Sequence, residues 1–162
     1  MDALAQLSAA AAELLKASGE TVAVAESSAG GLISAALLAQ PGASAYFRGG
    51  GVIYTAQARA ALLPDPGDAT EWERASTEAY ALWLARTIAA HLGADWGVAE
   101  TGAAGPTGNR YGDAPGHCCI AVAGPVDHAA TIETGHGRRE DNMRAFAAAA
   151  LDLLAEAIRQ SQ

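Results

Sequence analysis

The stretch that decides the fold runs from residue 21 to residue 38 and reads Thr-Val-Ala-Val-Ala-Glu-Ser-Ser-Ala-Gly-Gly-Leu-Ile-Ser-Ala-Ala-Leu-Leu. Residues 21–25 are a short apolar, partly β-branched run, which is typical of a strand buried on both faces. Residues 27–31 read as a tight turn, and residues 32–38 read as a helix that Pro41-Gly42 ends. This strand–turn–helix order predicts an α/β domain.

Outward from this unit the chain continues to alternate between helical and strand patterns. The spacing of apolar residues predicts helices over 2–18, 56–63, 76–93 and 140–159, and strands beginning at Val52 and over 96–99, 117–123 and 129–133. Strands interleaved with helices place helices on both faces of a mostly parallel sheet. We therefore expect one three-layer α/β/α domain over residues 1–162, with a mostly parallel sheet of about five strands.

The composition limits the partners that this chain can have. Of 162 residues, 51% are hydrophobic and 17% are charged, and the formal net charge is −8. That balance excludes a disordered chain and argues against DNA or RNA as a partner, because nucleic-acid binding leaves an electropositive surface. No apolar run is long enough to span a membrane. A small anionic ligand stays compatible, because backbone amides and a few arginines can bind a phosphate locally.

The cysteines and histidines give no sign of a metal centre or of a structural disulfide. Cys118 and Cys119 are adjacent, so they read as small core residues in a reducing compartment. The four histidines have no metal-ligand spacing. The N-terminus lacks the basic region of a signal peptide. We therefore expect a cytoplasmic protein without a metal or cofactor.

The turn at residues 26–31 has two interpretations. Glycines at a helix start allow close approach of a ligand, and the free N–H groups there favour an anion or a developing oxyanion. A serine at such a turn is then a candidate nucleophile, with the amides of Ala29, Gly30 and Gly31 beside it. Alternatively, Ser27 or Ser28 only caps the following helix.

Two further segments have the character of a binding site. Residues 100–109, Glu-Thr-Gly-Ala-Ala-Gly-Pro-Thr-Gly-Asn, follow a predicted strand and open a long glycine-rich loop. This loop either binds a ligand or is a flexible connection. Arg138 and Arg139 lie at the start of the last helix, where they either bind a phosphate or carboxylate or form surface salt bridges with Glu140 and Asp141.

Several separated motifs in this order resemble the C-terminal domain of the competence/damage-inducible CinA family, over nearly the whole chain. The matching residues are Ala25-Glu26-Ser27 with Gly30-Gly31, Pro41 to Phe47 including Ser44, Gly51 to Tyr54, Thr101-Gly102 with Ala104-Gly105-Pro106, Pro115-Gly116, and Gly137 with Arg139-Glu140. Stand-alone members of this family include nicotinamide mononucleotide deamidases. The resemblance implies hydrolysis of a carboxamide to a carboxylate and ammonia, with no cofactor, and a homo-oligomer.

The family's catalytic residues fall on this chain with one substitution. The resemblance places the serine on Ser27, the activating tyrosine on Tyr54, and the activating lysine on Arg59. An arginine stays protonated and is a poor general base, whereas a desolvated lysine can lose its proton. Ser28 and Ala29 also stand where the family often has Cys and Thr, and Ala114 where a lysine is frequent.

Two functions follow from this pattern. In the first, Ser27 attacks the amide carbon, Tyr54 assisted by Arg59 handles the proton, and a small nucleotide is the substrate. Its ribose and phosphate then contact Ser44, Thr101, Gly102, Gly105, Arg138 and Arg139. In the second, the arginine marks a catalytically weak or inactive nucleotide-binding protein.

Overall fold

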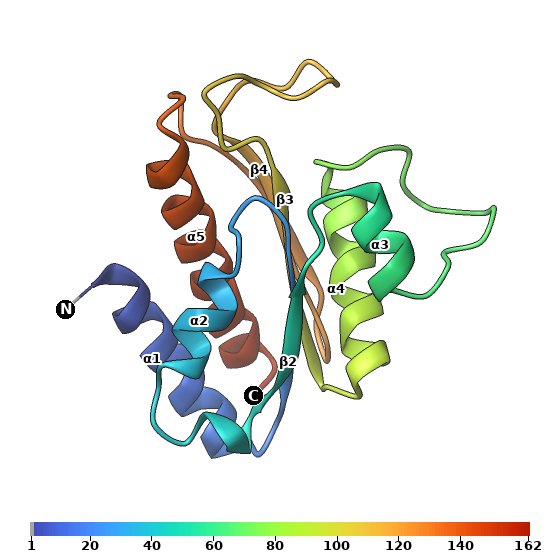
Figure 1. Cartoon of the computed structure of the whole chain (residues 1–162). Coiled ribbons are helices and arrows are strands. Elements are labelled where there is room, and N and C mark those ends of the chain that lie inside the picture. The colour runs from blue at the N-terminus through green and yellow to red at the C-terminus, as the bar shows by residue number, and fades with distance from the viewer. Residues whose placement is uncertain (1) are drawn as a thin grey trace.

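A computed structural model describes residues 2–162 and shows a sheet of five strands between two layers of helices (Figure 1). The elements, in chain order, are α1 (Ala3–Ser18), β1 (Val22–Glu26), α2 (Leu32–Leu38), the short 3-10 helix η1 (Ala43–Ala45), β2 (Phe47–Val52), α3 (Ala56–Leu62), α4 (Glu78–Leu92), β3 (Trp96–Gly102), β4 (His117–Ala123), β5 (His128–Glu133) and α5 (Arg139–Gln160). Among residues 2–162, no helix has the length and apolarity needed to cross a membrane.

The strand order across the sheet is β2-β1-β3-β4-β5. Strand β1 pairs in parallel with β2 and with β3, whereas β3–β4 and β4–β5 are antiparallel pairs. Four of these five strands therefore point the same way, and β4 runs against them. The expected three-layer α/β/α fold with a mostly parallel sheet of five strands is confirmed, and the two antiparallel pairs make the sheet mixed.

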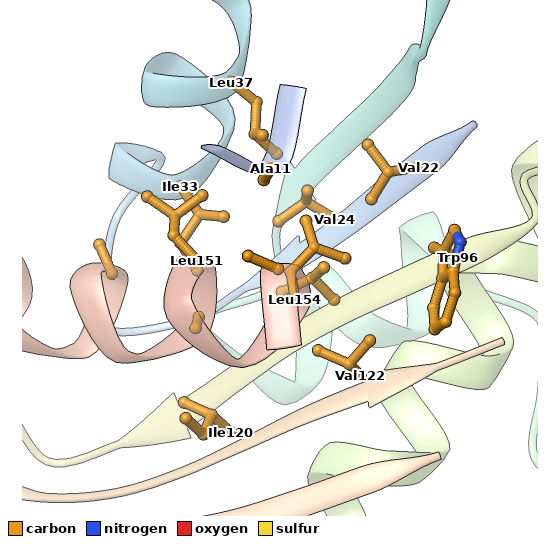
Figure 2. Packing of buried hydrophobic residues seen from close by; sticks show 14 of the residues in the cluster. Ala11, Val22, Val24, Ile33, Leu37, Trp96, Ile120, Val122, Leu151 and Leu154 are labelled. Carbon is orange, nitrogen blue, oxygen red and sulfur yellow. The ribbon is translucent and has the colours of Figure 1, made fainter. Parts of the chain in front are cut away.

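The two faces of the sheet carry side chains of different size. Val22 and Val24 point toward α1, α2 and α5, where they pack in the cluster of buried residues drawn in Figure 2. Ala23 and Ala25 point the other way, against α4. The same alternation of large and small residues recurs in β3 and β4, because successive side chains of a strand face opposite sides. These small residues let helix α4 pack closely against the sheet.

Gly97 marks the closest approach between α4 and β3. A Cβ atom at this position would lie 1.8 Å from the carbonyl oxygen of Ala85. We expect Gly97→Ala to lower the free energy of unfolding by about 3 kcal/mol, measured by urea denaturation, because a backbone group cannot move aside as a side chain can. The matched control is Gly51→Ala, where the nearest atom is the Ile53 Cδ1 at 3.3 Å. An equal loss in both variants would contradict this reading.

The second strand differs from the prediction. The sequence predicted a strand that begins at Val52, but β2 ends there and begins at Phe47. The strand therefore includes the run Gly49-Gly50-Gly51, which disfavours strand structure on its own. A Cβ on Gly50 would lie 2.7 Å from the Ser34 Oγ and 2.9 Å from the Val24 carbonyl oxygen. Close packing against β1 and α2 thus requires glycine here, and tertiary structure overrides the local preference.

Candidate functional site

The sequence-predicted nucleophile lies at the edge of the sheet where β1, β2 and β3 all end. Glu26 is the last residue of β1 and pairs with Val52, the last residue of β2. The Ile53 N–H donates to the Glu26 carbonyl oxygen at 2.6 Å, which holds the chain leading to Tyr54 beside the turn that begins at Ser27. Open α/β sheets bind ligands at this edge. The topology therefore places both Ser27 and Tyr54 at this edge of the sheet, and the roles that the resemblance gives them stay predictions.

Two buried glutamates fix the turn that carries Ser27. The Glu100 carboxylate reaches across from β3 and accepts the Ser27 N–H at 2.9 Å, the Ala29 N–H at 2.8 Å and the Ser28 hydroxyl. Glu26 accepts the N–H groups of Gly31, Ile33 and Ser34 at the start of α2. Both glutamates are almost wholly buried. Sequence reasoning did not assign either of them, although each is a carboxylate that ends an otherwise apolar run, at Ala25-Glu26 and Ala99-Glu100.

The amides of residues 29–31 are engaged within the protein. The Ala29 N–H donates to Glu100, the Gly31 N–H donates to Glu26, and the Gly30 N–H donates to the Ser27 carbonyl oxygen at 3.1 Å. The expectation that these amides bind an oxyanion is therefore corrected, because none is free to do so. Within residues 2–162, the Ser28 N–H has no protein acceptor and the Ser27 hydroxyl has no hydrogen-bond partner.

Tyr54 is paired with an arginine, but with a different one from that predicted. The Arg139 guanidinium, at the start of α5, donates to the Tyr54 hydroxyl at 3.2 Å and to the Gly105 carbonyl oxygen at 2.5 Å. Three predicted site residues from distant parts of the sequence therefore meet at one point. The Tyr54 side chain stays 58% exposed, so its hydroxyl is accessible from solvent.

Arg59 lies on α3 and faces an aromatic cluster instead of Tyr54. Its guanidinium donates to the Tyr80 hydroxyl at 3.3 Å and lies over the Trp72 ring, 5.0 Å from the ring centroid. Within residues 2–162, no hydrogen bond joins Arg59 to Tyr54. The expected Tyr54–Arg59 pair is corrected to Tyr54–Arg139, because the first turns of α3 direct Arg59 toward α4.

The other residues that the sequence predicted to contact substrate lie at different places in the structure. Thr101 is 3% exposed, and its hydroxyl accepts the Ser76 N–H at 3.1 Å, so it holds the start of α4. Gly102 packs against β4, where a Cβ would lie 2.5 Å from the His117 carbonyl oxygen. Ser44 precedes β2 and therefore lies at the opposite end of the sheet from Ser27. Within one chain Ser44 therefore cannot contact a substrate beside Ser27, which corrects that expectation, whereas Thr101 and Gly102 end β3 at the same edge as Ser27 and their contact with substrate stays a prediction.

The two adjacent arginines at the start of α5 have different partners, and the sequence left open whether they bind a ligand or form surface salt bridges. Arg138 forms an exposed ion pair with Asp141 at 2.8 Å. Arg139 turns toward Tyr54 and Gly105 instead. Arg138 therefore takes the surface salt bridge, and Arg139 joins the candidate site.

The long loop over residues 103–116 is fastened at its base and along its side (Figure 1). The fully buried Asn142 side chain donates to the carbonyl oxygens of Ala104 and His136, both at 2.8 Å. Farther along, Asp113 forms an ion pair with Arg74 at 2.8 Å. These contacts disfavour the alternative that this loop is only a flexible connection.

A protein-family model described as the CinA C-terminal domain matches residues 4–158. A CinA-like protein of Gloeobacter violaceus is 39% identical over 150 residues, which are 91% of this chain and 35% of the relative. A CinA-like protein of Synechocystis sp. is 41% identical over 126 residues, 78% of this chain and 30% of the relative. The chain thus spans about a third of the length of these curated relatives.

Solved structures are similar to this chain over its whole length. A competence-damaged protein (CinA) superfamily protein from Klebsiella pneumoniae has a TM-score of 0.89 at 25% identity and covers 99% of both chains. The competence/damage inducible protein CihA from Agrobacterium tumefaciens has a TM-score of 0.88 at 27% identity, with 99% of this chain and 98% of that chain covered.

Proposed function

Because this chain belongs to the CinA C-terminal domain family, we propose that it hydrolyses the carboxamide of nicotinamide mononucleotide. The products are nicotinic acid mononucleotide and ammonia. One observation carries the proposal: the Ser27 hydroxyl is free on a turn that two buried glutamates fix, at the edge of the sheet where the chain also leads to Tyr54, whose hydroxyl Arg139 contacts. A nucleophile beside a group that handles its proton is the arrangement that serine amidases need.

The reaction proceeds in two balanced steps. The Ser27 oxygen attacks the amide carbon as its proton passes to the Tyr54 oxygen, and the proton that the Tyr54 hydroxyl already carries passes on to the amide nitrogen, so Tyr54 stays a neutral phenol. Arg139 donates to the Tyr54 oxygen and orients it. The tetrahedral intermediate loses its C–N bond as the nitrogen takes this proton from Tyr54 and leaves as ammonia. Water then attacks the resulting ester, which releases the carboxylate and returns the proton to Ser27.

The developing oxyanion needs a hydrogen-bond donor that is not already used. The Ser28 N–H follows the nucleophile directly in the chain and has no acceptor within residues 2–162. In other serine hydrolases the amide after the nucleophile serves this purpose. We therefore assign the oxyanion contact to Ser28 instead of to the amides of residues 29–31.

The nucleotide phosphate requires positive charge on a chain whose net charge is −8. Arg139 at the start of α5 supplies it locally, beside the loop that Asn142 fastens. A substrate panel tests this part of the proposal. We expect ammonia release from nicotinamide mononucleotide to exceed release from nicotinamide and from simple aliphatic amides. Equal rates with all of them would contradict a nucleotide site.

A second candidate function is nucleotide binding without turnover. The observation that favours it is Arg59, since an arginine over the Trp72 ring cannot replace a lysine as the base. The first candidate depends on Tyr54 and Arg139 performing the proton transfer without that lysine.

Arg59→Lys separates these readings. We expect ammonia release to change by no more than about three-fold, because position 59 faces Trp72 and Tyr80 instead of Ser27. Steady-state measurement of kcat with nicotinamide mononucleotide checks this expectation. A gain of a hundred-fold or so would show that lysine restores a lost base and that Arg59 has disabled the enzyme.

A further inference from the structure

We infer that Glu100 is the residue that positions Ser27 for nucleophilic attack, an inference that rests on the amidase function proposed above. Glu100 touches neither the reacting carbon nor the leaving nitrogen in that scheme. It acts through the backbone of the turn and is therefore a positioning residue. Its carboxylate belongs to β3, whereas the turn follows β1, so the contact is a tertiary one between strands paired in parallel.

The contacts are concentrated on the nucleophile turn itself. One Glu100 oxygen accepts both the Ser27 N–H and the Ala29 N–H, and the other accepts the Ser28 hydroxyl. These three bonds fix consecutive residues of the turn and leave the Ser27 hydroxyl and the Ser28 N–H free. The free groups are the ones that the proposed reaction uses.

A purely structural explanation does not require Glu100. Glu26 already accepts the N–H groups at the start of α2, so the helix is capped without a second carboxylate. Burying a charge costs several kcal/mol, and no ion pair within residues 2–162 includes Glu100. A neutral side chain of the same size would fill this space without that cost in free energy. The cost is offset by three hydrogen bonds from the turn, and the Cys118 thiol on β4 adds a longer one at 3.8 Å.

The ionised form of Glu100 is the form that accepts all three hydrogen bonds. Burial raises the pKa of Glu100 above its ordinary value; bonds from Ser28, Ala29 and Ser27 oppose this, and the nearby Glu26 charge adds to it. The Cys118 thiol also faces this carboxylate, at 3.8 Å, and burial followed by the Glu100 charge raises the pKa of that thiol well above its usual value. Cys118 therefore stays a neutral thiol at neutral pH.

The contacts of Glu100 determine the direction in which Ser27 reactivity changes with pH. Below the raised pKa, Glu100 is protonated, its hydrogen bonds to the Ser27 and Ala29 amides weaken, and the turn loosens. Above that pKa the turn is held. We therefore expect Ser27 reactivity to rise with pH through the Glu100 titration, at a pH above the ordinary carboxyl range.

The first measurement uses the unmodified protein. The amide proton shifts of Ser27 and Ala29 are followed by NMR from pH 4 to 8, alongside the rate at which an alkyl fluorophosphonate labels Ser27. In that labelling the Ser27 oxygen forms a bond to phosphorus, fluoride leaves, and the serine proton goes to solvent. We expect both amides and the labelling rate to titrate with one midpoint. Independent midpoints, or no labelling of Ser27 at any pH, would overturn the inference.

The second measurement uses Glu100→Gln, which keeps the volume but cannot accept all three bonds. Misplacing a reacting group by about 1 Å costs on the order of 100-fold, so we expect kcat and the labelling rate to fall by about that factor with KM nearly unchanged. The titration that the amide shifts and the labelling rate share should also disappear. The control is Glu20→Gln, in which the removed carboxylate accepts from the Trp96 Nε1 at the opposite end of the sheet.

The two readouts separate this inference from the proposed function. Labelling of Ser27 that depends on Glu100, without hydrolysis of nicotinamide mononucleotide, would support the positioning role and reject the proposed substrate. Wild-type rates and an unchanged pH profile in Glu100→Gln would reject the positioning role even if the protein is an amidase. If Glu100→Gln does not fold, the wild-type titration alone decides.

Discussion

Ser27→Ala is expected to reduce ammonia release from nicotinamide mononucleotide by at least about 10³-fold, because removing a nucleophile leaves only binding and electrostatic contributions. The Ser27 side chain is half-buried and its hydroxyl has no hydrogen-bond partner within residues 2–162, so the substitution removes no bond that holds the fold. The Glu100 contact is to the Ser27 backbone and survives the change. The loss should therefore lie in kcat.

The measurement is steady-state ammonia release, with far-UV circular dichroism and thermal unfolding to verify the fold. Ser18→Ala is the matched control, because Ser18 is an exposed serine at the end of α1. The control should retain full activity. Turnover by Ser27→Ala within a few-fold of the unmodified protein would eliminate Ser27 as the nucleophile.

Arg139→Ala is expected to lower kcat by about 10²-fold, which is the usual cost of removing one donor from a site where charge develops. The substitution removes the guanidinium contact to the Tyr54 hydroxyl at 3.2 Å and frees the Gly105 carbonyl oxygen. A rise in KM should accompany the fall in kcat, because the same arginine is also proposed to contact the substrate phosphate.

The control for this variant lies on the same helix. Arg144 is half-exposed and pairs with Glu140 one turn away, so Arg144→Ala removes an equal charge without touching Tyr54. A kcat for Arg139→Ala equal to that of Arg144→Ala would contradict the proton-transfer role. A rise in KM alone, with kcat retained, would assign Arg139 to binding and leave Tyr54 without its partner.

The local pattern around residues 21–38 was sufficient to predict the fold. An apolar run, a glycine turn and a helix order the first β–α unit without tertiary information, and every helix expected from apolar spacing is present. Strand β2 could not be located in the same way. The three glycines within it have no preference for strand structure. Glycine is needed there because Gly50 packs closely against β1 and α2.

The candidate site was predicted in part. Ser27 and Tyr54 follow adjacent parallel strands, so topology alone brings them to one edge. Which arginine reaches Tyr54 depends instead on the direction in which α3 and α5 begin, and Arg139 is 85 residues away in sequence. Glu100 was missed for a related reason: its partners lie on another strand, and a lone glutamate at the end of an apolar run has no local signature.

If this edge of the sheet hydrolyses the amide of a nicotinamide nucleotide, the substrate consumed must equal each of the two products formed. Purified protein is incubated with nicotinamide mononucleotide, and substrate consumed, nicotinic acid mononucleotide formed and ammonia released are quantified together, with binding measured by calorimetry. We expect equal amounts of all three, formed at a rate that depends on Ser27. Binding in the calorimeter without formation of either product would contradict this activity.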